Sequence, residues 1–349
     1  MTFEKSAAVL AIVGNEGATN VGESLRRAAI SDGNEVFFFS AFSAGGKSQV
    51  MRAMSWRLGR RPVRLNRFSH EVVEACLDSK PFMLIATGAA PLTMDALQRL
   101  RAACITCVNY STDDPWNPNS RASWHLRALP EYDCVFTTRR ANIADFRKLG
   151  CRKVHYLPFG YDEWLWRCAA PVPDRAALDV LFVGGADRDR VVFMTEFMRN
   201  GPAVALVGGY WERYPATRPN ALGHKPPDAV AALTAAAKVN LCLMRRANRD
   251  GHVMRSFEIA VLGGCMLAED TPEHRDLFGA DGEAVVYFRT AAEAAERARA
   301  LLSDPAERAR LSDAVQARVV GGLHTYRDRL RSITELCVRT PGNKSALSA

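Results

Sequence analysis

Residues Val239–Met244 read VNLCLM, and they are followed by the loop Arg245–Gly251 and by HVMRSFEIAVLGGCMLAED over 252–270. The first run is apolar enough to be a buried strand, and Cys265–Ala268 is a second short run of the same kind. Between them, the pattern predicts a helix over Ser256–Leu262. A strand, a helix and a strand joined by short loops form the unit from which parallel sheets are built. This stretch therefore predicts an α/β fold.

The same alternation continues over most of the 349 residues. In the first half, strands are expected at 7–13, 35–42, 83–87, 105–110, 134–137 and 154–157, and helices at 21–31, 47–58, 69–79, 92–102 and 139–149. In the second half, further strands are expected at 179–183, 203–207 and 284–287, and further helices at 190–199, 228–237, 291–302, 305–320 and 324–338. Thr290 and Asp304 are the expected N-caps of two of these helices.

Two domains are expected, because a domain typically has roughly 100–200 residues and because Pro158–Asp162 is turn-rich. We place an N-terminal domain at 1–160, a second domain at 161–322, and a last helix with a disordered tail at 323–349. Glycines follow strands in both halves, and the helices after them would present free N–H groups to an anion. The sequence thus predicts a cleft between two domains that binds a phosphorylated ligand.

Composition excludes disordered, collagen-like and coiled-coil chains, since 48% of the residues are hydrophobic and 24% are charged. Nine cysteines, mostly within apolar runs, suit reduced thiols in a cytoplasmic protein. Met1–Ser6 lacks a basic segment of signal-peptide type, and no apolar run approaches the roughly 18 residues of a membrane span. No nucleic-acid partner is expected.

The net charge of +8 is concentrated locally. Residues 36–70 contain one lysine and six arginines and no acid. We expect residues 47–67 to contact an anionic acceptor or, peripherally, the inner face of a membrane. A solvated basic helix is an equally good interpretation of this segment.

Ala41–Ser48 reads AFSAGGKS and fits a relaxed phosphate-binding loop with alanine in place of the first glycine. No later apolar strand ends in the aspartate that would hold magnesium, so a P-loop nucleotide binder is a minor alternative.

The loop and helix at 250–258 carry the chemistry of the second half. The carboxylate of Glu258 could accept two hydrogen bonds from a ribose, and Arg255 could pair with a diphosphate that also meets the N–H groups of Gly251–Val253. His252 could reach a phosphate or a transferred sugar. The alternative is a glutamate favoured by the helix dipole beside a solvated arginine.

A family resemblance supports the functional interpretation. Its strongest part is Arg255-x-Phe257-Glu258 with Gly263, Thr271-Pro272-Glu273, Leu277-Phe278 and His324-Thr-Tyr326-x-x-Arg329. Weaker agreement is found at Val180–Gly184 with Arg188 and Arg190, at the linker Tyr156–Asp162, and at Asn109–Pro115. Over about 105–332 the chain resembles CgeB-like glycosyltransferases, relatives of the bacterial retaining enzymes of family 4.

The resemblance implies the GT-B architecture, in which two Rossmann-like α/β domains face a central cleft and the last helix crosses back to the N-terminal domain. It implies transfer of a sugar from a nucleoside-diphosphate sugar, UDP-sugar first, to a hydroxyl-bearing acceptor such as a glycan, lipid, protein or small molecule. Retention of configuration is implied, without a metal or other cofactor. Asp113-Asp114 agrees, because it lacks the Asp-x-Asp spacing of metal-dependent transferases.

Residue roles follow from the same resemblance. Glu258 would hold the donor ribose, with Asp250 where the family has another glutamate, and Arg190 or Arg188 would neutralise the leaving diphosphate. The other expected donor-binding residues are Gly184, Gly185, Lys225, Gly251, Val253 and Arg255.

Three candidate catalytic residues are Asp113, Asp114 and His252, of which the two aspartates would orient acceptor or donor sugar. An Asp-capped turn before Pro115 is the alternative for the pair. Gly14, Asn15 and Gly17 are the expected acceptor-side loop.

Two other functions stay open. A nucleotide-sugar epimerase or phosphorylase on the same fold would keep the nucleotide residues and change the sugar chemistry. A binding or sporulation-surface protein would keep the fold without turnover, although intact Arg190, Arg255 and Glu258 argue against it.

Glu258→Ala is expected to abolish donor binding because the ribose would lose its carboxylate partner, whereas Lys47→Ala is expected to leave binding intact. Calorimetry with UDP, GDP, ADP and dTDP on both variants measures this. Equal loss in both variants would contradict the assignment.

Overall fold

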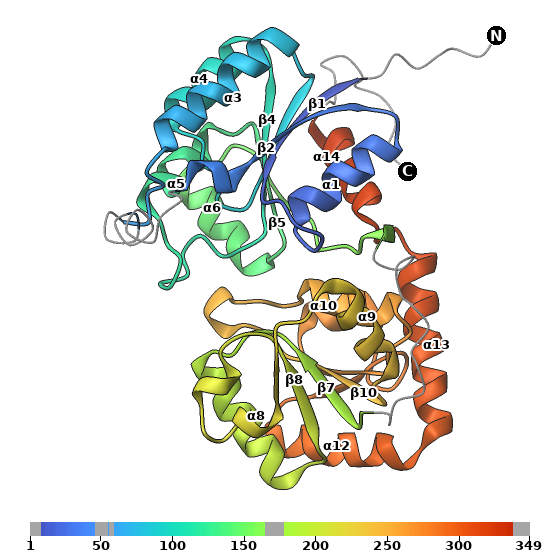
Figure 1. Ribbon diagram of the computed structural model, residues 1–349. Coiled ribbons are helices and arrows are strands. Elements are labelled where there is room, and N and C mark those ends of the chain that lie inside the picture. The colour runs from blue at the N-terminus through green and yellow to red at the C-terminus, as the bar shows by residue number, and fades with distance from the viewer. Residues whose placement is uncertain (1–7, 46–54, 56–58, 165–177, 338–349) are drawn as a thin grey trace, which may run out of the picture. The chain divides into compact units, whose positions relative to one another are not determined.

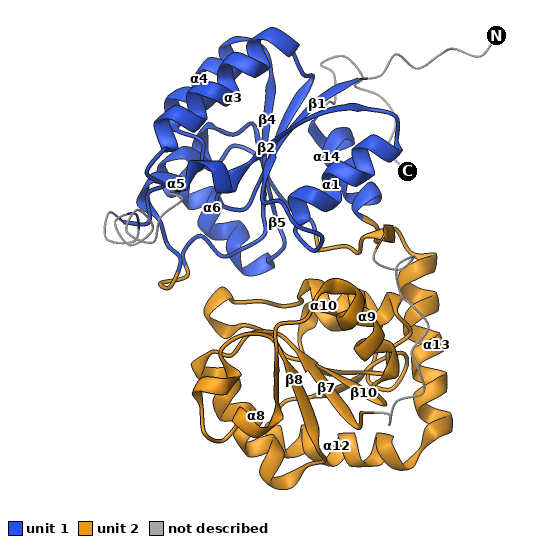
Figure 2. Cartoon of the chain, viewed as in Figure 1, with its two compact units in different colours: residues 1–116, 120–157, 326–349 blue, residues 117–119, 158–325 orange. Residues whose placement is uncertain are grey.

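A computed structural model of the chain describes residues 8–45, 55, 59–164 and 178–337. The chain divides into two compact units, shown in Figure 2. Unit 1 comprises residues 1–116, 120–157 and 326–349, and unit 2 comprises residues 117–119 and 158–325. The unit limits at 157 and 325 compare with the limits of 160 and 322 expected from the sequence. The segment 117–119, which belongs to unit 2, was not anticipated.

Unit 1 is built on a six-stranded parallel sheet with the order β2-β1-β3-β4-β5-β6. Its strands are β1 (Val9–Gly14), β2 (Glu35–Ser40), β3 (Met83–Thr87), β4 (Thr106–Ser111), β5 (Cys134–Thr137) and β6 (Val154–Tyr156). Its helices are α1 (Val21–Ser31), α3 (Leu65–Ser79), α4 (Met94–Ala102), α5 (Ser123–Ala128), α6 (Ile143–Leu149) and α14 (Tyr326–Cys337). Short 3₁₀ turns are η1 (Ala41–Ala44), η2 (Leu129–Glu131) and η3 (Arg140–Asn142).

Helices cover both faces of the unit 1 sheet (Figure 1). Ala11 and Val13 of β1 belong to a buried cluster with side chains from α3 and α4, and α1 packs against α14. Because side chains alternate along a strand, Leu10 and Ile12 of β1 point to the opposite face, and both are buried. The last helix of the chain is thus part of unit 1, where Arg327 pairs with Asp32 at 3.1 Å.

Unit 2 is built on a second six-stranded parallel sheet, with the order β12-β11-β10-β7-β8-β9. Its strands are β7 (Val180–Val183), β8 (Val204–Val207), β9 (Ala221–Gly223), β10 (Val239–Cys242), β11 (Met266–Glu269) and β12 (Val286–Phe288). Its helices are α8 (Arg188–Asn200), α9 (Pro227–Ala236), α10 (Met254–Val261), α11 (Pro272–Phe278), α12 (Ala291–Ser303) and α13 (Pro305–Gly321). Its 3₁₀ turns are η4 (Trp211–Arg213), η5 (Arg218–Asn220) and η6 (Arg246–Asn248).

The alternation along β7 shows how unit 2 is layered. Val180 and Phe182 pack with side chains of α8 and α12, whereas Leu181 and Val183 pack with side chains of α9. The sheet therefore lies between helices on both faces, which explains why its strands are continuous apolar runs in the sequence.

The predicted elements largely agree with those of the structure, and the differences lie at short or polar segments. The helix expected at 69–79 begins at Leu65, and the helix expected at 139–149 is divided into η3 and α6. Neither α5 nor β9 was expected, because each is too short for a periodic pattern. Most of the helix expected at 47–58, and the expected tail, lie outside the described residues.

Both predicted N-caps are confirmed. The Thr290 hydroxyl accepts a hydrogen bond from Glu293 N at 3.1 Å, and Asp304 Oδ1 accepts one from Glu307 N at 2.9 Å. The strand predicted at 105–110 is confirmed as β4, in which Cys107 is buried.

Gly208 follows β8 and lies against the backbone of Gly184, which follows β7. Its φ is +133°, and a Cβ there would collide with the backbone carbonyl of Gly184. The same carbonyl accepts a hydrogen bond from Trp211 Nε1 at 2.7 Å, so it cannot move away freely. Geometry rather than a ligand accounts for glycine at this position.

Gly208→Ala is expected to destabilise the protein by more than about 2 kcal/mol, because backbone strain adds to the collision. Gly282→Ala is the matched control, since Gly282 also has positive φ but nothing within 4 Å of an added Cβ; its cost should be about 1 kcal/mol. Urea unfolding measures both values. Equal destabilisation would contradict the close approach at Gly208.

Candidate functional site

The strand order of unit 2 reverses between β7 and β10, and Arg190 lies at this point. From the first turn of α8, its Nη1 donates to Gly185 O at 3.2 Å and its Nη2 donates to Leu243 O at 3.1 Å. These carbonyls follow the carboxyl ends of β7 and β10. In open parallel sheets, ligands bind outside the carboxyl ends of the strands where the order reverses.

The guanidinium of Arg190 is buried, with only 7% of the residue exposed. It lies 5.5 Å from the centre of the Phe182 ring, and Asp187, the N-cap of α8, is 3.7 Å from its Nε. Burial lowers the pKa of Arg190, the positive charge of Arg245 lowers it further, and Asp187 opposes both. An anion at this site would offset the burial of the charge.

The two expected donor residues of α10 are in contact with each other. Arg255 Nη1 lies 2.9 Å from Glu258 Oε2, one turn along the helix. The Glu258 side chain is only 7% exposed, so its carboxylate is paired in a buried position. We expected Glu258 to bind the ribose and Arg255 to bind the diphosphate separately. In the structure the two side chains are paired with each other.

His252 is fully buried in the loop before α10. Its Nε2 accepts a hydrogen bond from the N–H of Phe159 at 3.0 Å. A backbone N–H can only donate, so this ring nitrogen carries no proton. The bond occupies the atom that a general base would use and ties the segment after β6 to the loop.

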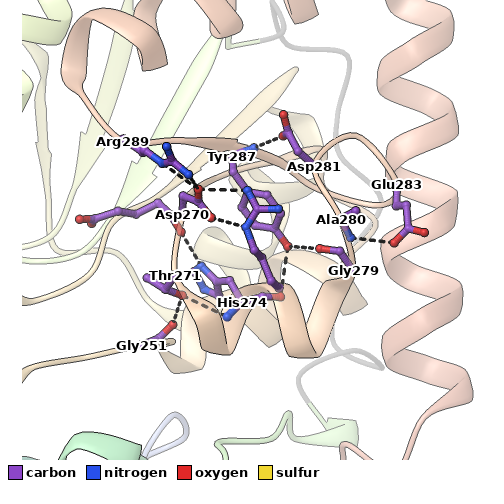
Figure 3. A network of polar contacts seen from close by, with 12 residues as sticks. Gly251, Asp270, Thr271, His274, Gly279, Ala280, Asp281, Glu283, Tyr287 and Arg289 are labelled. Carbon is purple, nitrogen blue, oxygen red and sulfur yellow. Dashed lines mark hydrogen bonds and ion pairs between the residues drawn. The ribbon is translucent and has the colours of Figure 1, made fainter.

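Two helices, α10 and α11, meet through a hydrogen-bonded set that we call the α10–α11 network: Gly251, Ser256, Thr271 and His274. Figure 3 shows Thr271, the N-cap of α11, whose hydroxyl donates to Gly251 O at 2.5 Å and accepts from His274 N at 3.0 Å. His274 Nδ1 is 2.8 Å from the carbonyl of Glu269, and its Nε2 is 2.9 Å from Ser256 Oγ. Since the carbonyl can only accept, Nδ1 carries the proton and Nε2 accepts from the serine hydroxyl.

The strand end before α11 is fixed by ion pairs, also drawn in Figure 3. Asp270 binds Arg275 Nε at 2.6 Å and Arg289 Nη2 at 2.9 Å. The hydrogen bond from Arg275 lowers the pKa of Asp270. Tyr287 OH lies 3.1 Å from the carbonyls of His274 and Gly279, at the two ends of α11.

Sequence reasoning did not assign roles to Ser256 and His274. Ser256 lies between two residues that were singled out, and His274 is three residues after the N-cap Thr271. Neither spacing predicts that a serine of one helix meets a histidine of the next, because the contact is made between elements.

Other predicted donor residues occupy different settings. Asp250 Oδ2 accepts a hydrogen bond from Arg245 N at 3.2 Å, within its own loop. Arg188 and Lys225 are exposed, and Val253, the N-cap of α10, donates its N–H to Ser256 Oγ at 3.3 Å.

The two candidate catalytic aspartates lie in unit 1 and differ from each other. Asp114 is buried, and its Oδ1 accepts hydrogen bonds from Trp116 N and from Asn142 Nδ2, both at 2.9 Å. Asp113 is exposed. The contacts of Asp114 are those of an Asp-capped turn, the alternative that the sequence left open.

In the expected acceptor-side loop, Gly14 ends β1 and packs closely, since a Cβ there would lie 2.9 Å from Gly22 Cα. Asn15 and Gly17 are exposed, and the positive φ of Gly17, +117°, is typical of a turn.

The remaining sequence hypotheses concern 41–67. Ala41–Ala44 form a 3₁₀ turn, whereas Lys47 and Ser48 of the relaxed phosphate-loop pattern lie outside the described residues. Of the basic segment, Arg60 donates to the carbonyl of Arg121 and Arg67 pairs with Glu71 at 2.8 Å.

The described residues contain no group of three or more histidine, cysteine, aspartate or glutamate side chains that could hold a metal ion. In the same part of the chain, every helix is too short or too polar to cross a membrane.

Comparison with known families gives a match over residues 188–335 to the model described as glycosyl transferase-like. The matched segment contains Arg190 and the α10–α11 network. Comparison with curated protein sequences found no match.

Solved structures are similar to this chain over most of its length. Sucrose-phosphate synthase from Thermosynechococcus elongatus has a TM-score of 0.69 at 15% identity, over 95% of this chain and 98% of that chain. Anabaena HepE in complex with UDP-glucose has a TM-score of 0.64 at 13% identity, over 95% and 100%. A UDP-forming trehalose-phosphate synthase from Burkholderia xenovorans has a TM-score of 0.62 at 12% identity, over 96% and 100%.

These similarities confirm the predicted GT-B fold of two Rossmann-like α/β domains. Together, the family match and the structural neighbours support a glycosyltransferase.

The α10–α11 network has a measurable pH signature. Burial lowers the pKa of His274 to about 4, while in the unfolded chain a histidine titrates near 6.5. Between these values the unfolded state binds the extra proton, so the free energy of unfolding should fall as pH falls. The limiting slope is roughly 1.4 kcal/mol per pH unit for one proton.

Urea unfolding from pH 7 to 4.5 measures this slope. His274→Gln is expected to reduce it, whereas His70→Gln, at an exposed position on α3, should not. Unchanged slope in the His274 variant would show that the imidazole is protonated in the folded protein.

Proposed function

We propose that the protein transfers a sugar from a nucleoside-diphosphate sugar to a hydroxyl-bearing acceptor, with retention of configuration and without a metal. The observation that carries this proposal is the buried Arg190 guanidinium at the strand reversal of unit 2, within the segment that matches a glycosyl transferase-like model. The α10–α11 network, which holds the start of α10, lies in the same unit and supports the proposal.

The chemistry suits these groups. Glycosyl transfer breaks the bond between the anomeric carbon and a phosphate oxygen and forms a bond from that carbon to an acceptor oxygen. Negative charge develops on the leaving diphosphate, and the acceptor proton passes to a phosphate oxygen. We infer that Arg190 stabilises that charge, and its burial would strengthen the attraction.

The pair Arg255–Glu258 supports the binding of the nucleoside portion. A ribose diol donates two hydrogen bonds, which a carboxylate accepts. Arg255 pairs with that carboxylate at 2.9 Å and retains further N–H donors for a phosphate oxygen. We infer that the two residues act as one unit rather than as separate contacts.

UDP is the nucleotide that we propose first. Two structural neighbours, HepE and the trehalose-phosphate synthase, are described with UDP-glucose or as UDP-forming. The acceptor is proposed only as a hydroxyl compound. The contact of residues 47–67 with an anionic acceptor or a membrane, and the cytoplasmic location, stay predictions.

Arg190→Lys is expected to weaken UDP binding about 10-fold or more, because lysine replaces a planar fork of donors with a single ammonium group. Arg188→Ala, two residues earlier and exposed, is the control and should change affinity by less than about 3-fold. Calorimetry with UDP, GDP, ADP and dTDP gives the affinities, and thermal unfolding shows that each variant is folded.

Mass spectrometry of acceptor mixtures incubated with nucleotide sugars tests the transfer itself. Wild-type protein that binds none of the four nucleotides would overturn the proposed function. If Arg190→Lys and Arg188→Ala changed the affinity for UDP equally, Arg190 would have no specific role in the proposed function.

A further inference from the structure

Glu273 lies in the first turn of α11, against the loop that leads into α10. Its carboxyl group fills the space beside Gly251 into which a side chain at that position would project. The contact is held from α11 itself, because the hydroxyl of Thr271 donates to Gly251 O at 2.5 Å. Because residue 251 is a glycine, the Glu273 carboxylate can lie against the loop before α10, which the sequence predicts to bind the donor.

The carboxylate of Glu273 differs from those of three other glutamates of unit 2, which have partners within the protein. Glu258 is paired with Arg255, Glu269 accepts from Met244 N at 3.1 Å, and Glu293 accepts from Arg289 N at 2.8 Å. Glu273 is half-buried, yet among the described residues no hydrogen-bond donor or cation is within bonding distance of its oxygens. A carboxylate can only accept, so a partly desolvated one needs a donor from outside the protein.

Sugar hydroxyl groups are donors of this kind, and one carboxylate can accept from two adjacent hydroxyls. The residue that the family resemblance implies for a sugar or phosphate contact, Asp250, already accepts a hydrogen bond from Arg245 N. It is also one methylene shorter than the glutamate of the family. Glu273 projects to the same loop from the neighbouring helix.

We propose that Glu273 binds hydroxyl groups of the transferred sugar and so determines which donor sugar is accepted. The inference rests on the proposed function, because it requires a nucleoside-diphosphate sugar with its diphosphate near Arg190 and α10. It gives a role to Glu273, which belongs to the Thr271-Pro272-Glu273 segment of the resemblance but not to the expected donor-binding residues.

A structural explanation makes a different prediction. An acid in the first turn of a helix is stabilised by the helix dipole, whatever the ligand. Glu293 occupies the first turn of α12, where Thr290 is the N-cap as Thr271 is in α11. Glu293→Gln therefore reproduces the loss of an N-terminal charge without touching the loop at Gly251.

The test compares UDP, which lacks the sugar, with UDP-glucose, UDP-galactose and UDP-N-acetylglucosamine. Calorimetry on wild type, Glu273→Gln, Glu273→Ala and Glu293→Gln gives, for each protein, the ratio of the Kd for UDP to the Kd for each nucleotide sugar. Charged hydrogen bonds contribute enough to binding that the ratio for the preferred sugar should fall about 10-fold in both Glu273 variants. The Kd for UDP itself should stay within about 2-fold, and Glu293→Gln should match wild type.

Unchanged Kd ratios in folded Glu273 variants would overturn the inference. The proposed function would still stand in that case, provided that the wild-type protein binds UDP. Weaker binding of UDP and of every sugar to the same extent would also overturn it, because that result assigns Glu273 to the loop structure. Wild type that binds no nucleotide would overturn both.

Discussion

The guanidinium of Arg190 bridges the segments that follow two neighbouring strands, β7 and β10. β7 and β10 are neighbours, but the chain leaves them in opposite directions across the sheet, and Arg190 hydrogen-bonds to the carbonyls that follow both. Hydrogen bonds from a charged group contribute about 1.5–3 kcal/mol each. Burial of that charge beside Phe182 opposes folding. The site therefore combines an organising contact with a cation that an anionic ligand would help to stabilise.

The start of α10 is held by its own Ser256 together with side chains of α11. Val253 is a poor N-cap residue, since it has no side-chain oxygen, and Ser256 Oγ accepts the N–H of Val253 instead. Ser256 is held in turn by His274, and Gly251 by Thr271. Arg275 and Arg289 fix the strand end through Asp270. A chain of neutral and charged hydrogen bonds thus sets the position of Arg255 and Glu258.

Much of the fold could be predicted, because long apolar runs in parallel strands and capped helices leave clear patterns. Thr290 and Asp304 were identified as N-caps from local sequence alone. The sites were predicted less completely. Glu258, Arg255 and Arg190 were singled out, but the ion pair between the first two was not. His252 and Asp114 were candidate catalytic residues. The turn at Asp114 was an alternative that the sequence left open, whereas no spacing reveals the buried hydrogen bond that His252 accepts from the N–H of Phe159.

By itself the sequence determined the α/β class, because strand and helix periodicity and N-caps are local properties, and it predicted two domains and the stretch that we propose binds the donor. Only the tertiary structure decided the partners of the polar side chains. Ser256 with His274, Arg190 with Leu243, and Glu273 beside Gly251 each join different elements. Such contacts depend on how helices pack on a sheet, and that packing determines whether a buried polar group is satisfied within the protein or left to a ligand.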